Sequence, residues 1–320
     1  MRSLAALVVI CVFGLAGLTA WLAFDYRKPD PAGPGSKPGP AAVIALPAQP
    51  PAPKAPDSAK PRLVYLDPGL VEDGAWGPLP RIGAKGRKPA QVYARPFVNP
   101  EKRPRIAIVV TGLGLEATLT KAALKGLPGP VTLAFSAYAP GLYGWTEQAR
   151  AGGHEVLVEL PMAGADRSRH APGPKALEAS LSPKDNRDRL HWVLSRFVGY
   201  VGVIGAPEGA LPVHTAAFEP VLGDVLGRGL IYLQPRPASA ASPGAKPGTA
   251  HVDIWLDTVL DPDAIDRRMR LAEALARGRG WVVAGVRAYP VTVDAVRRWA
   301  QALQERDLIA APLTAVAAAK

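Results

Sequence analysis

The chain has 320 residues, 48% of them hydrophobic and 20% charged, which is enough for a large globular core. Its single cysteine, Cys11, excludes an intrachain disulfide framework and a cysteine-rich zinc site. The formal net charge of +11 comes from scattered basic residues without a nucleic-acid-binding motif, so we expect no nucleic-acid partner. An anionic membrane or envelope surface suits such diffuse positive charge better.

Residues 1–28 predict an N-terminal membrane anchor. The stretch 4–24 carries no charge, and as a helix it would span roughly 30 Å, the thickness of a bilayer hydrocarbon core. Aromatic residues and then Arg27 and Lys28 follow at one end, as at a membrane interface. A cleaved signal peptide is the alternative, but the apolar run is long and lacks a good cleavage site. Basic residues on both sides leave the orientation open.

A proline-rich linker is expected at residues 29–62, which contain 11 of the 35 prolines. Proline removes amide donors and restricts the residue before it, so this stretch cannot form a helix or a sheet. We expect a disordered spacer that carries a folded domain away from the membrane. The remaining chain divides into an extended lead-in at 63–103, a folded domain at 104–314 and a tail at 315–320.

Strands and helices alternate through the folded domain. Helices are expected at 116–124, 143–151, 183–197, 216–226, 262–277 and 291–303. Strands are expected at 106–110, 131–135, 155–160, 200–204, 230–233, 252–256, 281–286 and 308–311. These strands are apolar on both faces, which predicts an α/β fold with a parallel sheet covered by helices. Periodicity alone does not separate an open doubly wound sheet from a closed barrel.

Ligands of both architectures bind at the carboxyl ends of the strands, so candidate site residues are sought there. Thr111 to Gly114 has glycines after a strand but lacks a complete phosphate-loop motif, and is interpreted as a tight turn. Carboxylates, a guanidinium and an aromatic ring could hold a sugar by hydrogen bonds and stacking. The candidate substrate-binding residues at or near strand ends are His154, Glu159, Glu208, Asp257, Arg287 and Tyr289.

Alternatives to this interpretation stay open. For His154, at the start of a strand, a structural hydrogen bond is the favoured alternative. Glu159 and Asp257 could instead form a glycosidase-like carboxylate pair, although spacing across a fold is invisible in sequence. The five histidines form no HxxH or HxxxH pair, and no G-x-S-x-G nucleophile motif occurs.

An ordered series of short motifs resembles the divergent polysaccharide deacetylase family of Gram-negative bacteria, a branch of the NodB-like deacetylases. The series covers about residues 77–315. Its motifs are YARPF (93–97), RPRIAIVV (103–110), LPGPVTLAF (127–135), ARAGGHEVL (149–157), LPM (160–162), PGP (172–174), LSRF (194–197), GYVG (199–202) and PVT (290–292). The resemblance implies a NodB-like distorted (β/α) barrel of about seven strands, a carbohydrate ligand and an envelope location.

Catalytic members of the wider superfamily hold a divalent metal, usually zinc, with an aspartate and two histidines, while a neighbouring aspartate acts as the base. The metal activates water and polarises the acetyl carbonyl. In this chain the Asp-Asp pair falls on Thr111 and Gly112, and the two histidine-bearing segments fall on 205–209 and 287–290, which contain no histidine. We therefore expect no metal site, no cofactor and no catalytic residue of the usual kind.

Two functions follow from this resemblance as expectations. The first is a single-pass inner-membrane protein whose C-terminal domain lies in the periplasm and binds envelope glycan without metal-dependent catalysis. The second is an active deacetylase acting on envelope polysaccharide through a rearranged site, in which case zinc would be the cofactor. The sequence identifies neither the glycan nor any protein partner.

Overall fold

The computed structural model describes residues 66–164, 172–206, 215–235 and 247–317, all within one compact unit, Ala59–Lys320. The predicted anchor (1–28) and linker (29–62) lie outside the described residues. Within the described ranges, no helix is both long and apolar enough to cross a bilayer.

A nine-stranded sheet forms the centre of the described unit, and all of its strand pairs are parallel. The spatial order is β8-β7-β6-β5-β4-β3-β10-β9, and β11 pairs with the start of β3. The strands are β3 (Arg105–Leu113), β4 (Thr132–Ser136), β5 (Val156–Leu160), β6 (Gly202–Gly205), β7 (Ile231–Gln234), β8 (Thr249–His251), β9 (Ile254–Trp255), β10 (Trp281–Arg287) and β11 (Ile309–Ala311). The predicted parallel α/β sheet is confirmed.

The two edges of this sheet meet. Only Val252 and Asp253 separate β8, at one edge, from β9, at the other. The Val252 N–H donates to the Gln234 carbonyl of β7 (2.8 Å), and the Asp253 N–H donates to the Val283 carbonyl of β10 (2.9 Å). The sheet therefore curls round on itself, as in a (β/α) barrel. The same crossing explains why the strand expected at 252–256 is divided between two partners.

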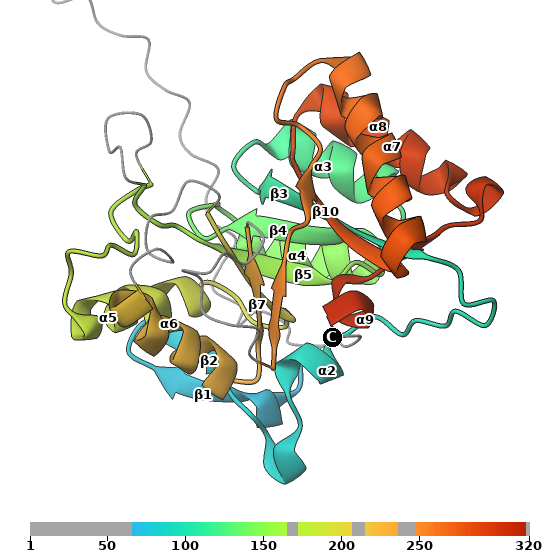
Figure 1. Ribbon diagram of the computed structural model, residues 1–320. Coiled ribbons are helices and arrows are strands. Elements are labelled where there is room, and N and C mark those ends of the chain that lie inside the picture. Colours follow the sequence, from blue (N-terminus) through green and yellow to red (C-terminus); the bar gives the residue numbers. More distant parts are fainter. Residues whose placement is uncertain (1–65, 165–171, 207–214, 236–246, 318–320) are drawn as a thin grey trace, which may run out of the picture. The chain divides into compact units, whose positions relative to one another are not determined.

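Six helices connect the strands and cover the outer face of the sheet in the described chain. They are α3 (Ala117–Gly126), α4 (Leu142–Ala151), α5 (Pro183–Leu194), α6 (Thr215–Gly227), α7 (Pro262–Arg279) and α8 (Pro290–Ala302). In Figure 1, α3, α7 and α8 lie together on one side, and α5 and α6 lie side by side on another. Helix α5 begins as predicted, because the Ser182 hydroxyl accepts the Asp185 N–H and Pro183 takes the first helical position.

Successive side chains of each strand point to opposite faces of the sheet, which divides the apolar core into two layers. Along β3, Ile106 and Ile108 face the helices, while Ala107 and Val109 face the inside of the curl. The inner layer consists of small and medium side chains that are almost completely buried. Helix α9 (Leu313–Ala317) covers its N-terminal end with Leu313 and Val316. The open end of the curl is therefore the end at which the strands finish.

The lead-in segment contains secondary structure that the sequence did not predict. Strands β1 (Val71–Gly74) and β2 (Gly77–Pro80) form an antiparallel hairpin, and α2 (Pro89–Val92) follows. The hairpin packs against α5, where the Trp76 Nε1–H donates to Asp188 Oδ1 at 3.0 Å. A hairpin of this size is marginal by itself, so its packing against the helical layer supplies its stability.

Candidate functional site

The carboxyl ends of β3, β5, β9 and β10 meet at the open end of the curl. There Thr111 lies opposite Arg287 in the β3–β10 register, and the Ala288 N–H donates to the Thr111 carbonyl at 2.8 Å. Glu159 reaches across β4 to Gly112, and Arg287 binds Asp257. These contacts join Thr111, Gly112, Glu159, Asp257 and Arg287 into one group, here named the strand-end site.

Glu159 lies near the end of β5 with its side chain on the inner face of the sheet. The Gly112 N–H donates to Glu159 Oε1 at 2.5 Å. Gly112 has a φ of +82°, and the Ala288 nitrogen, at 3.9 Å, is the one heavy atom found within 4 Å of the place where a Cβ would stand. Burial raises the pKa of Glu159 to about 7, and the Gly112 hydrogen bond only partly offsets this effect. The carboxyl group is therefore part protonated at neutral pH.

Asp257 and Arg287 form an ion pair with one deeply buried partner. Arg287 donates to Asp257 Oδ2 from its backbone N–H (3.1 Å) and from Nε (2.8 Å), and Nη2 donates to the Asp257 carbonyl at 3.0 Å. Asp257 is 1% exposed, whereas the Arg287 side chain is 42% exposed. The other carboxylate oxygen of Asp257, Oδ1, is buried and has no hydrogen-bond partner in the described chain. An unsatisfied acceptor of this kind is costly unless a donor from solvent or ligand reaches it.

Exposed apolar side chains border the strand-end site. Tyr289 follows β10 and is 36% exposed, and Leu115, Val259 and Leu260 follow β3 and β9 with more than half of their surface in solvent. The Tyr289 backbone is fixed by Thr292, whose Oγ1 accepts the Tyr289 N–H at 2.9 Å. The sequence had singled out Tyr289 but not the other three. The sequence pattern that could have identified these three is a large apolar residue in a polar segment that follows a strand.

One predicted site residue, His154, does not join this group. His154 precedes β5 and so lies at the opposite end of the sheet, where its Nδ1–H donates to the Val131 carbonyl at 2.8 Å. Burial lowers the pKa of this imidazole, which favours its neutral form. The competing interpretation of His154, a structural hydrogen bond, therefore matches its position. Glu208 lies outside the described residues.

The described residues of the strand-end site do not fit a zinc ion. Gly112 offers no side chain, and the Asp257 carboxylate already binds a guanidinium. The described histidines are engaged elsewhere: His154 with Val131, His191 with Asp224, and His251 with Asp253. Across the described ranges, no three histidine, cysteine, aspartate or glutamate side chains gather as metal ligands.

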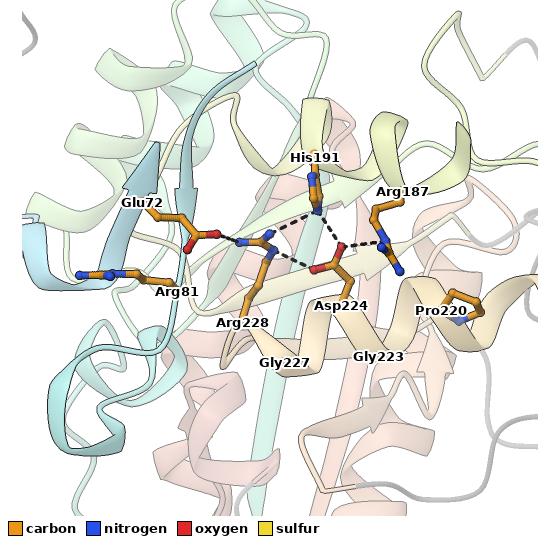
Figure 2. Close-up of a pocket in the computed structure, with 9 residues that line it drawn as sticks. All are labelled: Glu72, Arg81, Arg187, His191, Pro220, Gly223, Asp224, Gly227 and Arg228. Atoms are coloured by element: carbon orange, nitrogen blue, oxygen red, sulfur yellow. Dashed lines mark hydrogen bonds and ion pairs between the residues drawn. The ribbon is translucent and has the colours of Figure 1, made fainter. Parts of the chain in front are cut away.

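A separate cavity of about 630 Å³ lies on the outer surface between the hairpin and helices α5 and α6 (Figure 2). Arg228 occupies its centre and donates to Asp224 Oδ1 (2.9 Å), Glu72 Oε1 (2.7 Å) and the Pro80 carbonyl (2.9 Å). His191 contacts Asp224 Oδ2 at 2.7 Å. Burial alone would raise the pKa of Asp224, but the His191 hydrogen bond and the Arg228 charge lower it overall.

The polar groups at the centre of this cavity satisfy one another. Because Arg228 joins the hairpin to α6, the cluster is best explained as a structural connection between the lead-in and the helical layer. Glu72 and Arg228 are 156 residues apart in the chain, so no local sequence pattern predicts this contact.

Comparison with known proteins identifies the family. Residues 108–317 match the family model described as divergent polysaccharide deacetylase. The crystal structure of uncharacterized protein ATU2773 from Agrobacterium tumefaciens C58 is 32% identical, with a TM-score of 0.70, covering 75% of this chain and 99% of that chain. None of the curated proteins matches this chain.

Two further solved structures are more distant. A putative cellobiose-phosphate cleavage protein (EF3048) from Enterococcus faecalis V583 is 13% identical, with a TM-score of 0.47 over 67% of this chain and 99% of that one. The catalytic domain of a peptidoglycan N-acetylglucosamine deacetylase from Eubacterium rectale ATCC 33656 is 12% identical, with a TM-score of 0.42 over 68% and 90%. Likenesses this weak do not bear on function. The family match spans most of the chain, and the curled parallel sheet agrees with it: the chain belongs to the divergent polysaccharide deacetylase family.

Proposed function

We propose that this protein binds a glycan of the cell envelope at the strand-end site and does so without metal-dependent catalysis. Family membership supports carbohydrate as the ligand class. The observation that carries the proposal is the chemistry of the site itself. It offers the carboxyl group of Glu159 and the partly exposed side chain of Arg287, beside an apolar rim.

These groups match the needs of a sugar ligand. Sugar hydroxyls both donate and accept hydrogen bonds, so they can bind the Glu159 carboxyl group and the Arg287 side chain. The apolar face of a sugar ring can pack on Tyr289 at the rim. The same described residues are a poor match to the usual zinc site of the superfamily. They include no imidazole, and Glu159 is the one carboxylate among them without a cationic partner.

A second candidate function is hydrolysis of envelope polysaccharide through a rearranged site. The pKa of Glu159, about 7, favours this candidate, because a general acid or base works best with a pKa near the ambient pH. Asp257 is a weaker second carboxylate for such a reaction, since its ion pair with Arg287 keeps Oδ2 engaged.

The two candidates separate in one experiment with the full chain purified in detergent. Envelope glycan fragments are titrated while binding is followed by calorimetry and released acetate is measured in the same samples. Binding without acetate release supports the binding protein. Acetate release that disappears in a Glu159→Gln variant supports the hydrolase. If neither binding nor release occurs with any fragment, the proposed function is wrong.

We further propose that residues 1–28 anchor the protein in the inner membrane and that the linker 29–62 places the C-terminal domain in the periplasm. The uncharged apolar stretch and the proline content support this arrangement. A reporter enzyme that is active only in the periplasm, fused to the C-terminus, should be active. Activity of a cytoplasmic reporter at the same position, with a silent periplasmic one, would contradict this topology.

A further inference from the structure

A second cavity lies on the outer surface between α7 and α8, and it shares no residue with the strand-end site or with the cavity beside the hairpin. Its volume is about 270 Å³. Three arginines line it: Arg270 of α7, Arg298 of α8 and Arg306, which follows α8. Buried Met269 and Trp299 form the apolar part of the lining. A cavity this small suits one charged group of a ligand rather than a whole oligosaccharide.

Two of these arginines have no anionic partner. Neither Arg270 nor Arg298 forms an ion pair or a side-chain hydrogen bond with the described residues, and both are exposed. The neighbouring Arg297, in contrast, pairs with Asp294 at 3.5 Å. Cations that line the same cavity repel one another, and an anion placed among them converts this repulsion into attraction.

The third arginine is held in place by a buried carboxylate. Arg306 Nη1 donates to Glu273 Oε1 at 2.6 Å, and the same oxygen accepts the Trp299 Nε1–H at 2.9 Å. Glu273 is 9% exposed, whereas the Arg306 side chain is 48% exposed. A guanidinium has several N–H donors, so one bond to Glu273 leaves others for a ligand. Because Arg306 is already fixed, a ligand that binds it loses less free energy to ordering the side chain.

The charges around the cavity favour a phosphate group. Glu273 neutralises Arg306, so the excess positive charge comes from Arg270 and Arg298. Asp266 is the one carboxylate in the lining; it is exposed and forms no ion pair in the described part of the chain. A carboxylate ligand matches the fork of one guanidinium, whereas a phosphate monoester has three terminal oxygens and up to about two negative charges. A phosphate can therefore bind arginines from both helices together.

We propose that the cavity between α7 and α8 binds a phosphate monoester group, with Arg270 and Arg298 as its main donors and Arg306 as a third. Asp266 weakens this binding, because it places a like charge beside the anion. The group can come from a soluble sugar phosphate or from the headgroup of a phosphatidic acid. The proposal is independent of glycan binding at the strand-end site, since the two sites share no residue.

The test titrates the full chain, in a neutral detergent, with glucose 1-phosphate and follows binding by calorimetry. At about pH 7.5 the phosphate carries close to two negative charges. Glucose and glucuronate, at the same ionic strength, are the uncharged and carboxylate controls, and both should bind at least tenfold more weakly than the phosphate.

Four variants locate the binding. Arg270→Gln and Arg298→Gln should each weaken glucose 1-phosphate binding about tenfold, because each removes charge-assisted hydrogen bonds. Asp266→Asn should tighten it about threefold by removing the like charge. Arg267→Gln removes an exposed arginine of the same helix that does not line the cavity, and it should leave the affinity unchanged. All four positions are exposed, so thermal melts should show little change in stability.

A second titration distinguishes the two sources of the phosphate. The same protein is titrated with glucose 1-phosphate in micelles that contain phosphatidic acid or, as the control, phosphatidylcholine. Loss of binding with phosphatidic acid alone identifies the lipid headgroup as a ligand. Unchanged binding in both micelles supports the proposal with a soluble phosphate as the ligand.

Several results would overturn the proposal. It is wrong if glucose 1-phosphate does not bind, or if glucuronate binds equally well. It is also wrong if Arg270→Gln and Arg298→Gln bind as the unaltered protein does, or if Arg267→Gln loses as much affinity as they do. None of these results bears on glycan binding at the strand-end site, which is tested by its own experiment.

Discussion

At the residue scale, the Glu159 carboxyl group is largely removed from water and accepts one hydrogen bond from the described residues, the Gly112 N–H. One hydrogen bond from a backbone N–H only partly offsets the cost of removing a carboxylate from water. The neutral acid is therefore favoured, and the pKa of Glu159 rises. The sequence placed this residue at a strand end and among the site candidates. It could not show that Gly112 of β3, a strand two positions away in the sheet, would supply the only hydrogen bond found for it among the described residues.

Replacing Glu159 with Gln should stabilise the protein at alkaline pH. A pKa raised from 4.5 to about 7 means that the contribution of Glu159 to stability is full below pH 4.5 and is lost as the pH rises through 7. Glu159→Gln should therefore match the unaltered protein near pH 4 and exceed its free energy of unfolding by at most about 3 kcal/mol at pH 8.5. Urea denaturation at several pH values measures this difference. An equal gain from the control Glu147→Gln, which removes an exposed acidic group on α4, would contradict the explanation.

Replacing Arg287 should destabilise the fold through Asp257. Arg287→Met leaves the buried Asp257 carboxylate without its cation, a change that costs about 3 kcal/mol in comparable sites. The double variant Asp257→Asn, Arg287→Met removes both charges and should recover part of the loss. Denaturant unfolding of the single and double variants measures both values. If the double variant is less stable than Arg287→Met, the buried charge is not the cause.

At the element scale, most of the body follows from sequence patterns, and the exceptions have physical causes. The helix at α5 was predictable from Ser182 and Pro183, because capping is a local interaction. Hairpin β1–β2 was not, because its stability depends on α5 and Arg228, which lie more than 100 residues away. For a similar reason, the sequence did not predict that residues 252–256 would pair with strands at both edges of the sheet. Which strands they pair with depends on how far the sheet curls.

Arg228 should control how firmly the hairpin is attached. It contacts Glu72 and the Pro80 carbonyl from the hairpin and Asp224 from α6 (Figure 2). Arg228→Ala should lower the free energy of unfolding by about 3 kcal/mol, because partly buried Asp224 loses its main cation. Limited proteolysis should then cut within residues 66–82 faster than in the unaltered protein.

The matched control is Arg81→Ala, which removes an exposed cation lining the same cavity. A surface change of this type usually alters stability by no more than about 0.5 kcal/mol. Equal sensitivity of both variants to protease would show that the contacts of Arg228 do not hold the hairpin.

At the scale of the whole molecule, the strand-end site shows what the sequence can and cannot determine. Parallel strands bring Thr111, Glu159, Asp257 and Arg287 to one end of the sheet, and this was predictable from their places after strands. The pairing of Asp257 with Arg287, and of Glu159 with Gly112, depends on the curl and stagger of the sheet. His154 illustrates the same limit, because it begins the strand that Glu159 nearly ends and so lies at the opposite end.

The purified full chain should contain no stoichiometric zinc and should be indifferent to chelators. A zinc site of the superfamily type needs one carboxylate and two imidazoles at about 2.0–2.2 Å, and the strand-end site, as far as it is described, offers Glu159 beside Gly112 and an Asp257 already paired with Arg287. Metal analysis after dialysis, with thermal melts in the presence and absence of EDTA, tests this expectation. Removing a metal that is coupled to folding would lower the melting temperature. One zinc per chain, lost with EDTA together with several degrees of melting temperature, would mean that other residues complete a metal site, and the hydrolase would become the better explanation. No zinc, with a rise in melting temperature on adding a tetrasaccharide of N-acetylglucosamine, is the result expected of a binding protein.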